Sequence, residues 1–175
     1  MVLALITCFK PHWSPKTVPL YALCEGVALG GMSAILDLRF PGIVIQTLCL
    51  TFGTLFALLA SYRSGLITVN EGFRTTVYTA TGGFAIGMMG LFLMRMMGVS
   101  VPFLMSGPIA IGIGVVSVAL AASNLLLDFD AIQSYDMAGM PKWMEWYSGF
   151  TLLVTLVWMY TSILRVLALL RGSDQ

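Results

Sequence analysis

The sequence predicts an all-α fold, a polytopic membrane helix bundle that forms a single transmembrane domain over residues 1–175. Hydrophobic residues make up 58% of the chain and charged residues only 10%, whereas a soluble domain carries about 25% charged residues. The apolar residues fall into several long runs, which excludes a lone signal peptide. They also lack the alternating strands of about ten residues that build a membrane β-barrel. Helices are the remaining way to cross lipid with every backbone group hydrogen-bonded.

Five of the apolar runs have the length of a membrane span, which is about 20 residues. They cover approximately residues 18–36, 43–60, 75–93, 107–127 and 147–170. The apolar stretch at residues 1–9 has only about half of that length. We interpret it as the end of a helix whose beginning is missing, with a short interfacial anchor as the alternative.

Two glycine pairs in these spans have the spacing that lets membrane helices approach each other closely. Gly26 and Gly30 form a GxxxG pair in the first span, and Gly83 and Gly87 form another in the third. Small residues at this spacing bring two helix backbones together. We therefore expect both pairs to lie in helix–helix contacts.

The span at 107–127 organises the prediction of a functional site, because two acids follow it directly. At 1.5 Å per residue it covers roughly 30 Å, the thickness of the hydrocarbon core, and it ends at Asp128 and Asp130. Residues two apart on a helix point about 200° from each other, so both acids cannot face one cavity. Asn124 lies one turn before Asp128 and shares its face, which makes Asp128 the better candidate for the bundle interior.

Glu145 is the expected partner of Asp128. It begins the next helix at the same membrane level, so the two could meet across the hairpin. Two carboxylates in a low-dielectric site share a proton, which makes a proton-sensitive latch, and they attract Ca²⁺ transiently. The alternative is that Asp128 and Asp130 are solvated at a helix end and that Glu145 stabilises a helix N-terminus.

Glu25 is a second candidate for the ion pathway or the pH response. It lies roughly 10 Å inside the first span, where acids are rare and usually face the protein interior. The alternative is a side chain that reaches the interface or bonds a neighbouring helix. Arg95 and Arg165 are expected to extend toward the opposite membrane boundary.

Several classes of function are not supported. The net charge of +1 gives no sign of nucleic-acid binding, and the three cysteines have no metal-type spacing. The motifs HExxH, GxSxG and the phosphate-binding loop are missing, so we expect neither an enzyme nor a bound cofactor. The expected partner is the lipid bilayer.

The basic residues favour one orientation. One side of the membrane collects Lys10, Lys16, Arg63, Arg74 and Lys142, and the other collects Arg39, Arg95, Arg165 and Arg171. The positive-inside rule makes the first side cytoplasmic. Asp128, Asp130 and Glu145 then face the cytoplasm.

Five stretches resemble the bacterial branch of the Bax inhibitor family, the transmembrane Bax inhibitor motif proteins. They are CEGVALGGMSAI, FPGIVIQTLCLTFGTLFALL, SGPIAIGIG, SNLLLDFDAI and MEWYSGFTLLVTLVWMYTSILRVLALL, and the likeness extends from about Lys10 to Arg171. The resemblance implies a seven-helix bundle whose last helix is surrounded by the first six. It also implies a pH-sensitive calcium leak, gated by acids on the last two helices, in the bacterial inner (plasma) membrane.

The match is incomplete at two places. Asp128 matches the acid of the penultimate helix, but the acid expected on the last helix falls near Thr161 or Ser162, so Glu145 is our substitute. The stretch VLALITCFKP resembles the end of the family's second helix, which implies that the first helix and most of the second are missing. Two alternatives to a leak follow: a non-transporting partner or modulator of a membrane-bound protease, and an inactive truncated product.

Overall fold

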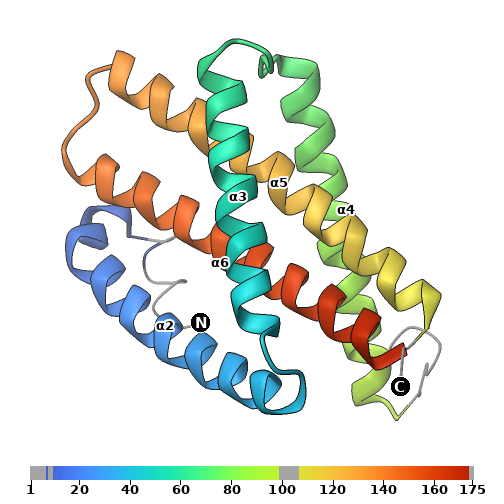
Figure 1. Cartoon of the computed structure of the whole chain (residues 1–175). Coiled ribbons are helices and arrows are strands. Elements are labelled where there is room, and N and C mark those ends of the chain that lie inside the picture. The colour runs from blue at the N-terminus through green and yellow to red at the C-terminus, as the bar shows by residue number, and fades with distance from the viewer. Residues whose placement is uncertain (1–6, 8–9, 99–106, 174–175) are drawn as a thin grey trace.

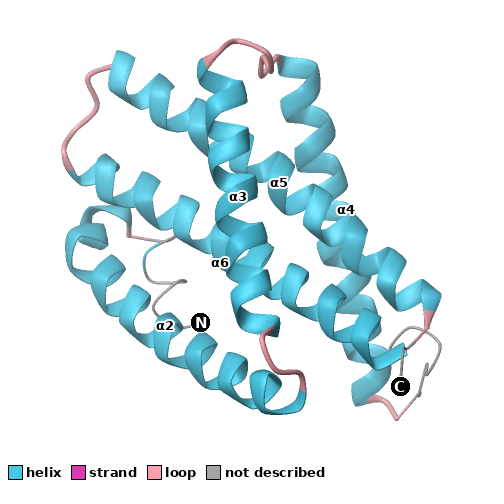
Figure 2. Cartoon of the chain, viewed as in Figure 1, coloured by secondary structure: helices cyan, strands magenta, loops and turns pink. Residues whose placement is uncertain are grey.

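The computed structural model describes residue 7 and residues 10–98 and 107–173, and these residues form helices without any strand (Figures 1 and 2). A short 3-10 turn, η1 (Pro11–Trp13), precedes the helices α2 (Ser14–Arg39), α3 (Ile43–Arg63), α4 (Glu71–Met96), α5 (Pro108–Met137) and α6 (Trp143–Ser173). Five helical segments are long and apolar enough to cross a membrane, which confirms the predicted class. The predicted half-span at residues 1–9 lies outside the described residues, apart from residue 7.

The helices are longer than the predicted spans, and the difference matters most in α5. This helix continues through both acids to Met137, ten residues beyond the predicted end at 127. No glycine or proline interrupts it before Gly139, which adopts a positive φ of 60°, and Pro141. The hairpin to α6 is therefore short and lies well past Asp128.

The last helix is central, as expected from the family resemblance. In Figure 1, α5 and α6 run side by side in opposite directions, and α2 and α3 pack against α6. The fourth helix, α4, packs mainly against α5. The bundle is thus built on the α5–α6 pair.

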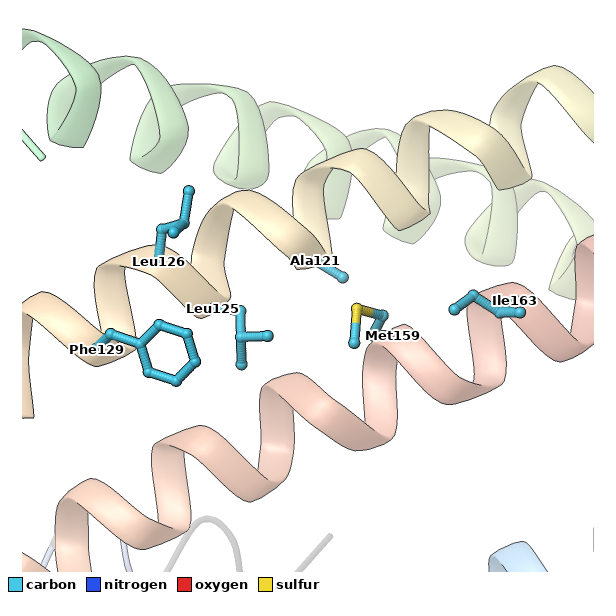
Figure 3. Close-up of a cluster of buried hydrophobic side chains, with 6 residues drawn as sticks. All are labelled: Ala121, Leu125, Leu126, Phe129, Met159 and Ile163. Carbon is cyan, nitrogen blue, oxygen red and sulfur yellow. The ribbon is translucent and has the colours of Figure 1, made fainter. Parts of the chain in front are cut away.

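Small side chains at helical spacing let α5 and α6 pack closely. The buried face of α5 repeats every three or four residues, at Ala110, Gly114, Ser117, Ala121 and Leu125. Part of the small-residue surface of α5 is therefore buried between helices. In Figure 3, Leu125 of α5 and Met159 of α6 continue the same contact toward the cytoplasmic end predicted above. Their cluster also contains Ala121, Phe129 and Ile163, and Leu126, which points away from α6.

Two smaller clusters fix the outer helices on α6. Val18 and Tyr21 of α2 pack on Phe150, and Ile43 of α3 packs on Tyr160 and Leu164. The Tyr160 hydroxyl also lies 2.7 Å from the hydroxyl of Ser33 in α2. Burial and one buried hydrogen bond therefore both hold α2 against the central helix.

Among the described residues, neither GxxxG pair lies in a helix–helix contact, contrary to the prediction. Gly26, Gly30, Gly83 and Gly87 are exposed, and a Cβ placed on any of them would meet no described atom within 4 Å. The helix faces that carry them point away from the bundle, because the buried faces of α2 and α4 are taken by other residues. The close approach occurs instead at Gly114, where an added Cβ would collide with Val166 of α6.

We predict that Gly114→Ala destabilises the protein relative to Gly112→Ala. Both changes remove a glycine from the interior of α5 and gain the same helix propensity, about 1 kcal/mol. Only Gly114 faces α6, and overpacking there should cost about 1–3 kcal/mol. Thermal unfolding of the two purified variants in the same detergent measures the difference, and equal melting temperatures would contradict the proposed close contact.

Candidate functional site

Asp128 lies in the contact between α5 and α6. Its carboxyl group faces the hydroxyls of Thr151 and Thr155 on α6. Its Oδ2 atom is buried and has no hydrogen-bond partner among the described residues. A buried polar atom without a partner is unfavourable and rare in folded proteins, so this position invites a functional explanation.

The two threonine hydroxyls already use their protons elsewhere. Thr151 Oγ1 donates to the backbone oxygen of Ser148 at 2.9 Å, and Thr155 Oγ1 donates to that of Thr151 at 3.1 Å. Each hydroxyl keeps lone pairs that can accept another bond. The two hydroxyl oxygens can accept a hydrogen bond from a protonated Asp128. Together with the carboxylate oxygens of Asp128, they can also act as ligands of a passing cation.

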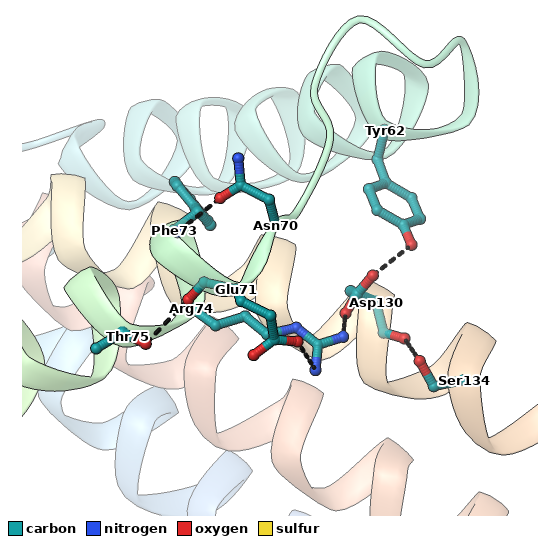
Figure 4. A network of polar contacts seen from close by, with 8 residues as sticks. All are labelled: Tyr62, Asn70, Glu71, Phe73, Arg74, Thr75, Asp130 and Ser134. Carbon is teal, nitrogen blue, oxygen red and sulfur yellow. Dashed lines mark hydrogen bonds and ion pairs between the residues drawn. The ribbon is translucent and has the colours of Figure 1, made fainter.

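Asp130 takes part in a different network, which joins three helices (Figure 4). Arg74 in the first turn of α4 forms an ion pair with Asp130 Oδ2, and its other nitrogen lies 3.6 Å from Glu71. The Tyr62 hydroxyl of α3 lies 2.8 Å from Gln133 Oε1 and 3.2 Å from Asp130 Oδ1. Since a phenol has one proton, it donates to one of these oxygens at a time.

The predicted divergence of the two acids is therefore confirmed. Asp128 faces α6, whereas Asp130 faces α3 and α4. The sequence interpretation did not identify Arg74 and Tyr62 as partners of Asp130. The sequence contained one indication of this pairing, because Arg74 and Tyr62 both lie at helix ends on the same predicted side of the membrane as Asp130.

Asn124 and Glu25, two other predicted site residues, are not hydrogen-bonded to Asp128 in the described structure. The Asn124 side chain donates to Thr81 Oγ1 at 2.7 Å and to the backbone oxygen of Leu120 at 2.8 Å, so it links α5 to α4. Glu25 is half-buried on α2 and makes no hydrogen bond or ion pair with any described residue. The structure does not bring Glu25 to the acids of α5.

The expected meeting of Glu145 with Asp128 does not occur. Glu145 is exposed and lines a cavity of about 950 Å³ between α3, α5 and α6, together with Arg63 and Asp136. Because α5 continues to Met137, the turn of the hairpin lies beyond Asp128. Its antiparallel neighbours therefore come from the third and fourth turns of α6, which carry Thr151 and Thr155.

The position near Thr161 and Ser162, where the family resemblance places the acid of the last helix, is also away from Asp128. The Ser162 hydroxyl lies 2.8 Å from that of Ser117, more than two turns before Asp128 on α5. No group of three His, Cys, Asp or Glu side chains that could hold a metal ion occurs in the described ranges.

We predict that Arg74→Gln lowers the thermal stability of the purified protein. Asp130 is 18% exposed and would lose its ionic partner, and a partly buried charge without its partner is unfavourable. Arg63→Gln is the matched control, because Arg63 is exposed at the same boundary and contacts no acid in the described structure. If both variants unfold at the same temperature, the ion pair does not stabilise the bundle.

Comparison with known proteins agrees with the architecture. The family model described as Bax inhibitor 1 like matches residues 1–172. The comparisons with curated proteins and with solved structures gave no significant match. The match covers nearly the whole chain, including every described helix and the acids of α5. The chain therefore belongs to the Bax inhibitor 1 like family of multi-pass membrane proteins.

Proposed function

We propose that this protein is a cation leak of the bacterial inner membrane, with calcium as the transported ion, and that protonation at Asp128 regulates it. The observation that supports this function best is the Asp128 carboxyl group, with one buried oxygen that lacks a partner, in the contact between the central helices. Ionisable groups inside a membrane domain are unfavourable and generally functional.

The chemistry of the site couples protons and cations. A carboxylate that has lost most of its water needs a compensating proton or cation. Both would bind the same Asp128 oxygen, and both can use the free lone pairs of Thr151 and Thr155. Because a proton and a cation compete for one place, cation passage there depends on pH.

The neighbouring acid does not share this role. Asp130 is already neutralised by Arg74, and this ion pair fastens the first turn of α4 to α5. A change at Asp130 would act on the position of α4, whereas a change at Asp128 acts directly on the α5–α6 contact.

We predict that Asp128→Asn abolishes the pH response of calcium flux in proteoliposomes, measured with a trapped calcium dye from mildly acidic to mildly alkaline pH. The amide fills the same volume but cannot exchange a proton. Asp136→Asn is the control, because Asp136 lies two turns further along α5 and is exposed. A pH response that persists in Asp128→Asn and equals that of the control would overturn the proposal.

A second candidate function is a non-transporting interaction partner, such as a modulator of a membrane-bound protease. The supporting observation is that the two GxxxG pairs on α2 and α4 are open, with no described atom near their Cβ positions. Faces of this kind associate with other membrane helices. This function requires no ion at Asp128.

For this second function, we expect Gly83→Leu combined with Gly87→Leu to abolish crosslinking to a partner in native membranes. Leucine side chains would separate the two helix backbones. Gly53→Leu is the control, because Gly53 is also open but belongs to no GxxxG pair. If the wild type gives no crosslinked product, or if the double variant gives the same products as the wild type, an interaction through α4 is contradicted.

A further inference from the structure

A second cavity lies between α4, α5 and α6, away from Asp128. It measures about 540 Å³, and its lining includes Phe84 and Met88 of α4, Gly114 of α5, and Trp158 and Arg165 of α6. Gly114 precedes Asp128 by 14 residues, or about 21 Å along the helix axis. The volume falls within the range of small-molecule sites, roughly 300–1,000 Å³.

Apart from Arg165, the polar side chains in the wall of this cavity are hydrogen-bonded within the protein. The Trp158 indole nitrogen donates to Ser117 Oγ at 3.0 Å, and Ser117 and Ser162 share a hydrogen bond of 2.8 Å. Thr161 donates to backbone oxygens of its own helix, and Thr81 accepts a hydrogen bond from Asn124. A wall whose polar groups are satisfied has little need of water, so it favours a hydrocarbon occupant.

Arg165 is the one charged residue that lines the cavity. It forms no hydrogen bond or ion pair with the described residues, whereas Arg171, further along α6, donates to Pro41 O and Gln46 Oε1. Arg165 lies six residues closer to the middle of the helix than Arg171, about 9 Å along its axis. Arg165 is exposed, and its planar guanidinium matches a phosphate group with two parallel hydrogen bonds.

We propose that this cavity binds an anionic phospholipid, with one acyl chain along the apolar wall and the phosphate group on Arg165. The apolar wall matches the acyl chain of such a lipid, and the guanidinium of Arg165 matches its phosphate group. The long side chain of Arg165 can reach the headgroup level at the boundary opposite Asp128. This binding is independent of ion conduction and needs no protonation step.

Native mass spectrometry of the full chain in detergent, with added phosphatidylglycerol or phosphatidylcholine, tests the headgroup contact. We expect phosphatidylglycerol to bind more tightly, and Arg165→Gln to weaken it roughly tenfold or more, the loss expected for a charged hydrogen bond. Arg39→Gln is the control, because Arg39 is exposed at the same boundary outside the cavity. Equal binding of the two lipids, or equal effects of the two variants, would overturn the proposal.

A second pair of variants tests the cavity itself. Ala85 lines the cavity on α4, so Ala85→Phe should displace the acyl chain and reduce phosphatidylglycerol binding, whereas Ala80→Phe on the same helix lies outside the lining and should not. Unaltered binding in Ala85→Phe would overturn the assignment to this cavity. If oleate binds more tightly than phosphatidylglycerol, the occupant of the cavity is a free fatty acid and not a phospholipid. The measurement uses no ion flux, so its result is separate from that of the leak.

Discussion

The close contact between α5 and α6 is the constraint on which the rest of the structure depends. Gly114 touches Val166 so closely that no side chain fits between them, and Ala121, Leu125 and Met159 are fully buried further along the pair. Lipid tails are as apolar as these side chains, so packing and buried hydrogen bonds hold the helices together. The same contact shields one carboxyl oxygen of Asp128 from water and sets the carboxyl group opposite Thr151 and Thr155.

The helix α4 is held differently from the others. Its main contacts are with α5, and Val77 is its one buried residue among those described. Among the described residues, three polar or aromatic contacts join it to the central pair. They are the Arg74–Asp130 ion pair, the Asn124–Thr81 hydrogen bond, and the tilted ring pair of Phe84 and Trp158, with 6.4 Å between ring centroids. A helix fastened by a few polar contacts shifts more readily than one packed along its length.

The two ends of the bundle therefore present different chemistry to the membrane. Acids and their partners gather where α5 ends, and Arg165, which has no acidic partner among the described residues, lies beside an apolar cavity nearer the other end. A change in the position of α4 would affect both places, because α4 contacts Asp130 at one end and lines the cavity further along. The proposed lipid site and the Arg74–Asp130 ion pair thus both involve α4 while using separate side chains.

The sequence alone determined the fold class, the five membrane spans and the acid with the most unusual environment, because hydrophobic run length and helical periodicity are properties of local sequence. The divergence of Asp128 and Asp130 also followed from helix geometry. Only the tertiary structure decided which groups face each acid. The end of α5 at Met137 placed Thr151, and not Glu145, beside Asp128, and the choice of buried helix faces left both GxxxG pairs open. Contacts between helices depend on their relative rotation and register, and a short stretch of sequence does not encode either.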